Sequence, residues 1–333
     1  MRTSTIQSPK GHSLRGSSLR SLLLTIVGVL LPLVMLGSPA TAQVPPADPP
    51  KVVVTNSILA DLVKQVGGDR VEMTVLVGPN GDAHSYEPVP KDSVRLREAA
   101  LVFENGLGFD AWIGDLVESS GSQAKRVVAS KRVKVRQPPA GPNGERPTCS
   151  HGHHSCGGDQ DPHVWHDVRN AVLMVEEIAD ALIAADPAYA ASYGLNRDAY
   201  IKELKTLDGW IDERVKTIPS KRRVIVTGHD TFGYFADRYG FRTMNVLGSV
   251  STGVGDPSAT DVAKVVEQVK QIGVPAVFSE NILNPKKTEL VARQAGVKVA
   301  RLYTDALGER DSPAPNYIAL MRHNVTTMVD ALR

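Results

Sequence analysis

In the first half of the chain, short hydrophobic runs alternate with segments that have helical spacing. Three apolar runs predict buried strands: 52–54, 71–77 and 101–103. Three further segments repeat apolar residues every three or four positions, as a helix does: 58–66, 93–100 and 111–117. Strands separated by helices of this length indicate parallel βαβ units.

The same alternation returns in the second half. Four segments predict strands: 223–227, 243–246, 276–278 and 297–303. Four others predict helices: 233–239, 260–272, 286–295 and 316–332. The chain is therefore expected to be an α/β protein with two βα lobes, each built on parallel-type sheets.

A long amphipathic segment separates the two halves. Asp186-Pro187 predicts a capped helix start, and Pro219 marks the end. Apolar residues between them recur at three- and four-residue steps: Tyr200, Leu204, Leu207, Ile211, Val215 and Ile218. At 1.5 Å per residue this helix would be about 45 Å long, which exceeds one small lobe. We expect a rigid linking helix over 186–219 between an N-terminal lobe, 51–185, and a C-terminal lobe, 220–333.

The first 42 residues have the pattern of a secretory signal peptide. They carry four basic residues and no acidic one, then an apolar run broken by Pro32, then Ala40-Thr41-Ala42. The run is shorter than the roughly 20 apolar residues of a membrane span. No cysteine lies near the cut to carry a lipid. We expect cleavage after Ala42, a Pro-rich leader over 43–50, and a soluble periplasmic protein without a lipid anchor.

Removal of the signal peptide changes the charge balance. The remaining chain has 34 Lys and Arg against 36 Asp and Glu, a net charge of −2. The basic balance of the full chain therefore belongs to the signal peptide. This composition gives no support for a nucleic-acid partner or an anionic membrane partner.

One stretch, 148–166, contains five of the nine histidines and both cysteines. Most of it lies in the segment 137–160, which is rich in Pro, Gly and His and lacks an apolar period, so we expect an exposed loop. Cys149 and Cys156 are expected to form a disulfide in an oxidising compartment, with thiolate metal ligation as the alternative. The loop histidines could collect zinc weakly or could simply remain solvated: His151, His153 and His154.

Four polar residues follow predicted strands or end the loop. In open α/β sheets, ligands bind beyond the carboxyl ends of the strands. His84, His229 and Asp305 come shortly after strands, and His163 ends the His-rich loop. Three imidazoles and one carboxylate suit tetrahedral Zn²⁺, and four protein ligands describe a closed binding site instead of a catalytic one.

Neighbouring polar residues leave alternatives open. His166 follows His163 at one-turn spacing and could share its helix face, but a partly exposed first-turn histidine is favoured because four ligands are already assigned. Asp167 and Asp230 lie beside ligand histidines and are expected to accept hydrogen bonds from imidazole N–H groups.

Five motifs, in this order and spacing, resemble the cluster A-I metal-binding proteins of ABC importers, the ZnuA/TroA type: DAHSYEP, DPHVWHD, GHDTFGYFADRYG, FSEN and TDALG. The resemblance covers nearly the whole chain after the signal peptide. It implies a metal held between two lobes by His84, His163, His229 and Asp305. Manganese-selective members carry Glu at the third position, so His229 implies zinc, in keeping with the preference of Zn²⁺ for nitrogen ligands.

The chain also departs from this family. An apolar residue usually stands at the position of His166, and the disulfide of the C-terminal lobe is absent, so a side branch such as the AztC type is an alternative. Glu280 matches a recurrent family acid, and we expect a buried, paired carboxylate there and not a metal ligand. The loop over 137–160 resembles the His-rich insert of zinc-type members.

The resulting prediction is a monomeric, non-enzymatic carrier that captures Zn²⁺ and delivers it to a membrane ABC permease, with a periplasmic zinc chaperone as a further candidate partner. A secreted zinc hydrolase is a rival, but it needs an open coordination position and a general base, and the chain lacks an H-E-x-x-H motif. A manganese or iron carrier of the same fold, and an adhesin or zinc buffer, are further rivals. Zinc affinity should fall below about pH 6, since a coordinating imidazole must be neutral.

Overall fold

The computed structural model describes residues 48–137, 160–245 and 259–333. The predicted signal peptide and the predicted disulfide, together with three of the candidate loop ligands, His151, His153 and His154, lie outside these ranges. Within them, no helix combines the length and apolar character that crossing a membrane requires.

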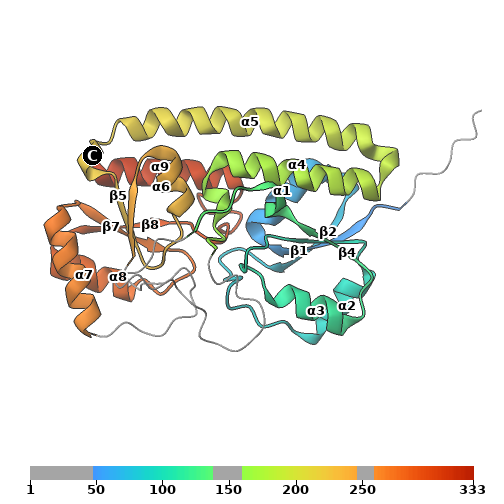
Figure 1. The fold of residues 1–333 in the computed structure, drawn as a ribbon, viewed down its shortest axis with the longest axis horizontal. Helices are drawn as coiled ribbons and strands as arrows, with labels where there is room; N and C mark the ends of the chain where they lie inside the picture. The colour runs from blue at the N-terminus through green and yellow to red at the C-terminus, as the bar shows by residue number, and fades with distance from the viewer. Residues whose placement is uncertain (1–47, 138–159, 246–258) are drawn as a thin grey trace, which may run out of the picture. The chain divides into compact units, whose positions relative to one another are not determined.

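The N-terminal lobe is built on a four-stranded parallel sheet in the order β2-β1-β3-β4 (Figure 1). Its strands are β1 (Lys51–Asn56), β2 (Glu72–Val77), β3 (Leu101–Glu104) and β4 (Lys125–Val128). The first three were predicted. The edge strand β4 was not, because it begins with two exposed charged residues and has no continuous apolar run.

Helices cover both faces of this sheet: α1 (Ser57–Gly67) and α4 (Val168–Ala185) on one, α2 (Pro90–Glu98) and α3 (Trp112–Ser120) on the other (Figure 1). Alternate residues of β1 point to the two opposite faces of the sheet. Val52 and Val54 belong to the core with α1 and α4, whereas Val53 packs with Leu96 of α2 and Ile113 of α3. Burial on both faces explains the nearly continuous hydrophobic runs of the two central strands, β1 and β3.

The C-terminal lobe contains two parallel strand pairs. Strand β5 (Val224–Thr227) pairs with β6 (Arg242–Asn245), and β7 (Ala276–Glu280) pairs with β8 (Lys298–Leu302). Strands β5 and β7 lie next to each other. The helices of this part are α6 (Gly233–Tyr239), α7 (Ala259–Ile272) and α8 (Lys286–Ala295), followed by the last helix, α9 (Tyr317–Leu332). The predicted α/β class with parallel strands is confirmed.

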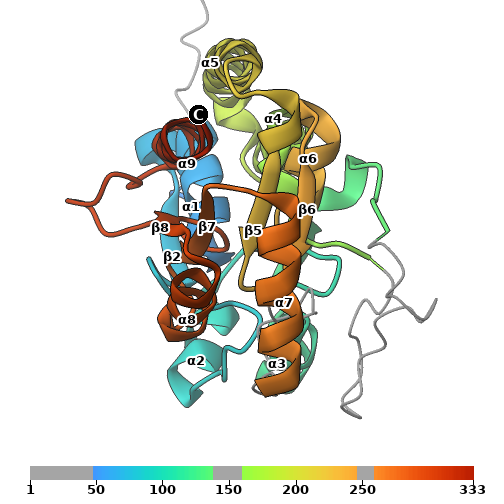
Figure 2. The same cartoon turned by 90° about the vertical axis from the view of Figure 1, so that its left-hand side faces the viewer.

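Helix α5 (Ala190–Lys216) runs alongside both lobes (Figures 1 and 2). It contacts α1 and α4 toward its start and α6 and α9 toward its end. Its 27 residues correspond to about 40 Å. The start differs from the prediction: Pro187–Tyr189 forms a 3₁₀ turn, and the Asp186 carboxylate accepts hydrogen bonds from Arg70 and Tyr193 instead of capping the helix.

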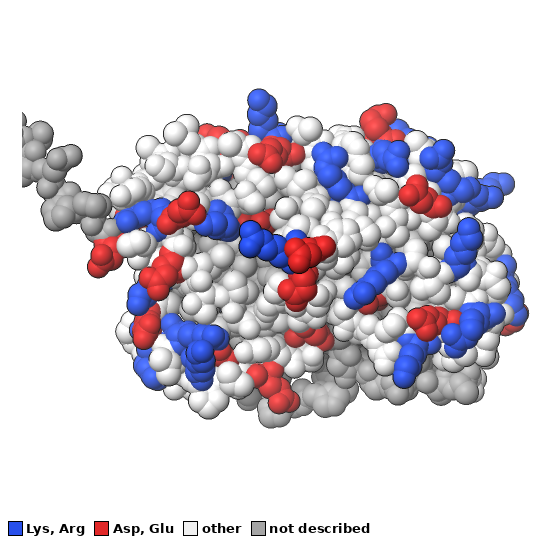
Figure 3. Space-filling view, turned by 180° about the vertical axis from the view of Figure 1, so that it is seen from behind, with Lys and Arg blue, Asp and Glu red and all other residues white. Residues whose placement is uncertain are grey.

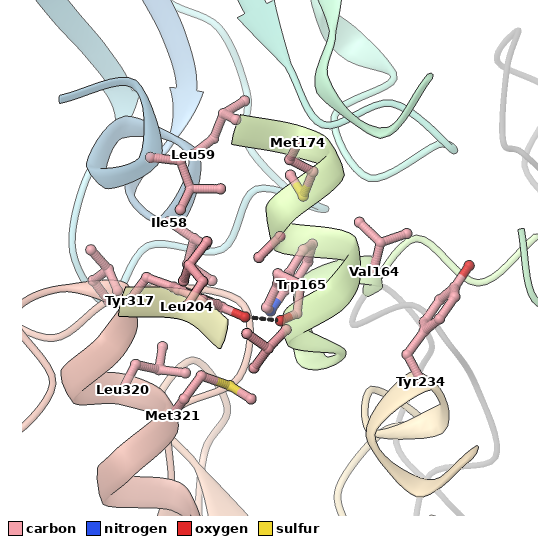
Figure 4. Packing of buried hydrophobic residues seen from close by; sticks show 14 of the residues in the cluster. Ile58, Leu59, Val164, Trp165, Met174, Leu204, Tyr234, Tyr317, Leu320 and Met321 are labelled. Carbon is pink, nitrogen blue, oxygen red and sulfur yellow. Dashed lines mark hydrogen bonds between the residues drawn. The ribbon is translucent and has the colours of Figure 1, made fainter. Parts of the chain in front are cut away.

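Trp165 joins elements of the two halves within the largest hydrophobic cluster (Figure 4). The Tyr317 hydroxyl of α9 donates to the Trp165 carbonyl at 2.6 Å, and the Trp165 indole N–H donates to the Thr304 carbonyl at 3.0 Å. Because Trp165 lies two residues after His163 and Thr304 directly precedes Asp305, these bonds fix the two candidate ligands relative to each other.

The face opposite to that of Figure 1 carries intermixed charges. Figure 3 shows Lys and Arg side chains lying close to Asp and Glu side chains across it. Ion pairs such as those of Arg132 with Glu177 and Arg238 with Asp208 are typical of the described surface. This face of the described chain therefore offers no extended basic patch of the kind that attracts nucleic acid.

Candidate metal centre

The structure brings the four sequence-predicted ligands together. His84 lies in the loop after β2, His229 follows β5, Asp305 follows β8, and His163 directly precedes a short 3₁₀ turn, η3 (Val164–His166). Each offers one nitrogen or oxygen atom, and these atoms all lie within 4.8 Å of one another. Two come from the N-terminal lobe as defined above and two from elements of the C-terminal lobe.

The spacing of these atoms suits a single ion. His84 Nε2 lies 3.2 Å from His163 Nε2 and 3.4 Å from Asp305 Oδ2. His229 Nε2 lies 3.1 Å from the same Asp305 oxygen. Ligand atoms around a tetrahedral ion with bonds of 2.0–2.1 Å are about 3.3–3.4 Å apart. The side chains of His163, His229 and Asp305 are fully buried, and that of His84 is 6% exposed.

Local bonds hold the His84 loop. The Asp82 carboxylate accepts the His84 backbone N–H at 2.9 Å. The Trp112 indole of α3 donates to the Ala83 carbonyl at 2.8 Å. The edge-to-face contact of the imidazole with Phe109, 4.6 Å between ring centroids, then limits rotation of the ring. The loop therefore presents Nε2 of His84 to the other ligands.

His163 is oriented by a buried carboxylate. Its Nδ1 lies 2.8 Å from Asp161 Oδ1, which leaves Nε2 to face the other ligands. The second Asp161 oxygen accepts from the Arg136 guanidinium at 3.0 Å, and Arg136 also donates to Asp237 of α6 at 2.8 Å. A Cβ on Gly233 would lie 2.6 Å from Asp161 Oδ2, so only glycine fits against this pair.

His229 has an equivalent partner in Glu280, the last residue of β7. The His229 backbone N–H donates to Glu280 Oε1 at 3.0 Å, and its Nδ1 lies 2.6 Å from Oε2. A Cβ on Gly228 would lie 2.8 Å from Glu280 Oε1, which explains the glycine before the ligand. Glu280 is 3% exposed, so the prediction of a buried, paired carboxylate is confirmed.

The predicted roles of Asp167 and Asp230 were wrong. Asp167 caps α4, where it accepts the Arg169 backbone N–H at 2.9 Å and pairs with the Arg169 guanidinium. Asp230 Oδ1 has no hydrogen-bond partner among the described residues. Asp161 could have been recognised locally, because an Asp side chain readily bonds the backbone two residues on, as it does with the His163 N–H at 3.1 Å. No local signal points to Glu280, which lies 51 residues from His229.

His166 is fully buried, so the prediction of a partly exposed histidine was wrong. Its Nε2 lies 3.3 Å from the Thr231 hydroxyl, and its ring packs 4.4 Å from that of Phe232. It does not join the cluster of candidate ligands. His163 precedes the 3₁₀ turn with a non-helical ψ of 45°, so helical spacing does not carry over to these two rings.

Charge within the cluster shifts its pKa values. Burial lowers the pKa of His163, but the Asp305 and Asp161 carboxylates overcome this effect and raise it to about 9. Burial also opposes protonation of His229, while Glu280 and Asp305 raise its pKa well above the usual value. For Asp305, the two charged imidazoles outweigh burial and hold the pKa well below the usual value. A cation that binds at these nitrogens therefore competes with protons up to a higher pH than it would at an ordinary imidazole.

The chain was compared with known proteins and structures. Residues 52–331 match the family model described as "Zinc-uptake complex component A periplasmic". The chain is 35% identical to "Manganese-binding lipoprotein MntA" of Halalkalibacterium halodurans, over 85% of this chain and 88% of that protein. It is 29% identical to "Iron-binding protein YfeA" of Yersinia pestis, over 88% and 91%. The solved structure of the periplasmic zinc binding protein TroA from Treponema pallidum aligns with a TM-score of 0.73 and 29% identity, over 85% of this chain and 99% of that chain.

Proposed function

This chain belongs to the ZnuA family of periplasmic metal-uptake components, and we propose that it captures Zn²⁺ outside the cytoplasm and delivers it to a membrane ABC permease. Proteins of this family bind transported metal ions and are not enzymes. The proposed ligands are His84, His163, His229 and Asp305.

One observation carries the choice of zinc: the donor set consists of three imidazole nitrogens and a single carboxylate oxygen, all within 4.8 Å of one another. Imidazole suits zinc, whereas oxygen ligands suit manganese. The other nearby carboxylates, Asp161 and Glu280, face the Nδ1 atoms of His163 and His229. They are therefore engaged in orienting ligands and do not enlarge the oxygen share of the set.

A manganese or iron carrier is the second candidate, because the two relatives described above are named for those metals. Metal competition separates the candidates. Purified protein should retain one equivalent of zinc against excess manganese, and His229→Ala should lose it, with His323→Ala on α9 as a control outside the cluster. Displacement of zinc by manganese at equal concentration would overturn the assignment.

The use of the carboxylates in the described part of the chain disfavours the hydrolase alternative. Asp161 and Glu280 lie against the Nδ1 atoms of the ligand imidazoles, and the fourth donor is Asp305. A hydrolytic zinc site instead keeps one position for water and a base beside it. This arrangement supports binding and release.

Several predictions about the chain's context remain proposals. These are the lobe boundaries at 185 and 220 on either side of the linking segment, the monomeric state, and a periplasmic zinc chaperone as donor. Secretion without a lipid anchor is also a proposal, and it runs against the relatives named as lipoproteins. The two cysteines of the sequence are at 149 and 156. Fractionation after detergent-free lysis tests the location, since recovery in the membrane fraction would contradict it.

A further inference from the structure

Thr231 links the candidate ligand Asp305 to the buried histidine that the cluster does not use. Its hydroxyl lies 3.1 Å from Asp305 Oδ1 and 3.3 Å from His166 Nε2. All three residues are fully buried. Thr231 belongs to the segment between β5 and α6, His166 ends η3, and Asp305 follows β8, so the contact exists only in the folded chain.

The proton positions in this chain of contacts follow from chemistry. The Thr231 hydroxyl has one proton, and it donates that proton to Asp305 Oδ1 at 3.1 Å. Thr231 must then accept from His166. The His166 ring therefore presents an N–H to this hydroxyl, at 3.3 Å from Nε2.

The His166 proton is therefore assigned to Nε2. Its Nδ1 has no hydrogen-bond partner in the parts of the chain that the structure describes. A buried N–H without an acceptor is rarer than an unused acceptor, so the tautomer with the proton on Nε2 fits the surroundings. The resulting series runs from His166 N–H to the Thr231 hydroxyl and from that hydroxyl to Asp305.

This series makes the two Asp305 oxygens inequivalent. Oδ2 lies 3.1 Å from His229 Nε2 and 3.4 Å from His84 Nε2, where it can share an ion with them. Oδ1 lies 3.8 Å from His163 Nε2 and receives the Thr231 proton instead. The bond from Thr231 occupies a lone pair of Oδ1 and orients the carboxylate so that Oδ2 faces the imidazole nitrogens.

We infer that Thr231, held by His166, limits Asp305 to one metal–oxygen bond and thereby makes the site selective for Zn²⁺ over Mn²⁺. The inference rests on the proposed function. Zinc prefers four ligands in a tetrahedron, whereas manganese prefers more ligands and more of them oxygen. Thr231 and His166 are positioning residues, because neither belongs to the ligand cluster.

Three variants test this inference. Thr231→Val keeps the shape of the side chain and removes the proton donor, Thr231→Ser keeps the hydroxyl, and His166→Leu removes the N–H that orients it. Each is loaded with Co²⁺, whose visible absorption is intense in a tetrahedral site and weak at higher coordination. The ratio of zinc to manganese affinity is then measured by competition.

We expect an intense Co²⁺ spectrum for the wild type and for Thr231→Ser. Thr231→Val should show the weaker bands of higher coordination, and its zinc-to-manganese affinity ratio should fall about 10-fold to 100-fold, as is typical for groups that orient ligands. His166→Leu should change both readouts in the same direction by a smaller factor. Loss of stability alone would not alter the shape of the Co²⁺ spectrum.

A Thr231→Val protein with the wild-type spectrum and affinity ratio would overturn the inference while leaving the zinc carrier intact. If Thr231→Val does not fold, His166→Leu decides in the same way, and unchanged readouts would overturn it. A wild-type protein that binds neither zinc nor manganese would instead refute the proposed function, and this inference with it.

Discussion

Replacing Gly233 with alanine should destabilise this protein, although alanine usually stabilises a helix. Gly233 is the first residue of α6. In an exposed helix, a change from glycine to alanine favours folding by about 1 kcal/mol. Here the added Cβ would lie 2.5 Å from Arg136 Cζ and 2.6 Å from Asp161 Oδ2, so the ion pair between them has to separate.

The magnitude follows from the burial of the two partners. The Asp161 side chain is fully buried and the Arg136 side chain is 16% exposed, so the guanidinium is the group that can withdraw. Overpacking costs about 1–3 kcal/mol, and full removal of one partner of a buried pair costs about 3–5 kcal/mol. Because Arg136 is displaced and not removed, only a part of the ion-pair free energy is lost in addition to the cost of overpacking. Helix propensity offsets about 1 kcal/mol of this sum. We therefore expect the free energy of unfolding to fall by about 1–3 kcal/mol.

Urea denaturation of the metal-free protein measures this loss. Gly209→Ala is the matched control, because Gly209 lies inside α5 and its Cβ would meet nothing within 4 Å. It should raise the free energy of unfolding by up to about 1 kcal/mol. Zinc affinity of Gly233→Ala should also fall about tenfold, since Asp161 orients His163. A Gly233→Ala protein as stable as Gly209→Ala would refute the reasoning.

Three further predictions concern the site and its support. Glu280→Gln should weaken zinc binding about 10-fold to 100-fold by calorimetry, because His229 loses its charged partner; unchanged affinity would argue against that role. The pKa of His163 is raised to about 9, so its stabilising contribution to the metal-free fold is complete below about pH 6.5 and disappears as pH rises through 9. The metal-free Tm should thus decrease over that window while zinc affinity increases, as protons on His163 and His229 no longer compete; parallel trends in the two measurements would contradict this. Tyr317→Phe should cost about 0.5–1.5 kcal/mol in denaturation experiments by removing the bond to the Trp165 carbonyl, and no change in stability would show that this bond is dispensable.

The pH prediction also revises the expectation from the sequence. An ordinary imidazole would lose zinc only below about pH 6, whereas the raised pKa values of His163 and His229 move proton competition into the neutral and basic range. The shift arises from Asp161, Glu280 and Asp305 and depends on their distances from the rings. The spacing of residues along the sequence does not reveal these distances between side chains.

The sequence by itself determined the α/β class, most strands, and the positions of the candidate ligands. Periodicity reports which residues are buried, and parallel strands bring their carboxyl ends to one edge. Residues directly after strands, such as His229 and Asp305, could therefore be expected to lie near each other. The buried face of helix α5 could be predicted for the same reason, because its apolar residues recur at helical spacing. The edge strand β4 was missed, since exposed charged residues interrupt the hydrophobic signal.

Only the tertiary structure decided which polar groups support the ligands. Glu280 reaches His229 because β5 and β7 lie next to each other, and Thr231 reaches Asp305 across 74 residues. His166 is buried because of what packs around it, and nothing in its local sequence predicts that. Hydrophobic periodicity specifies which face of a helix or strand is buried. The contacts between polar side chains on different elements depend on how those elements pack, to within a fraction of an ångström, and that information arises only when the chain has folded.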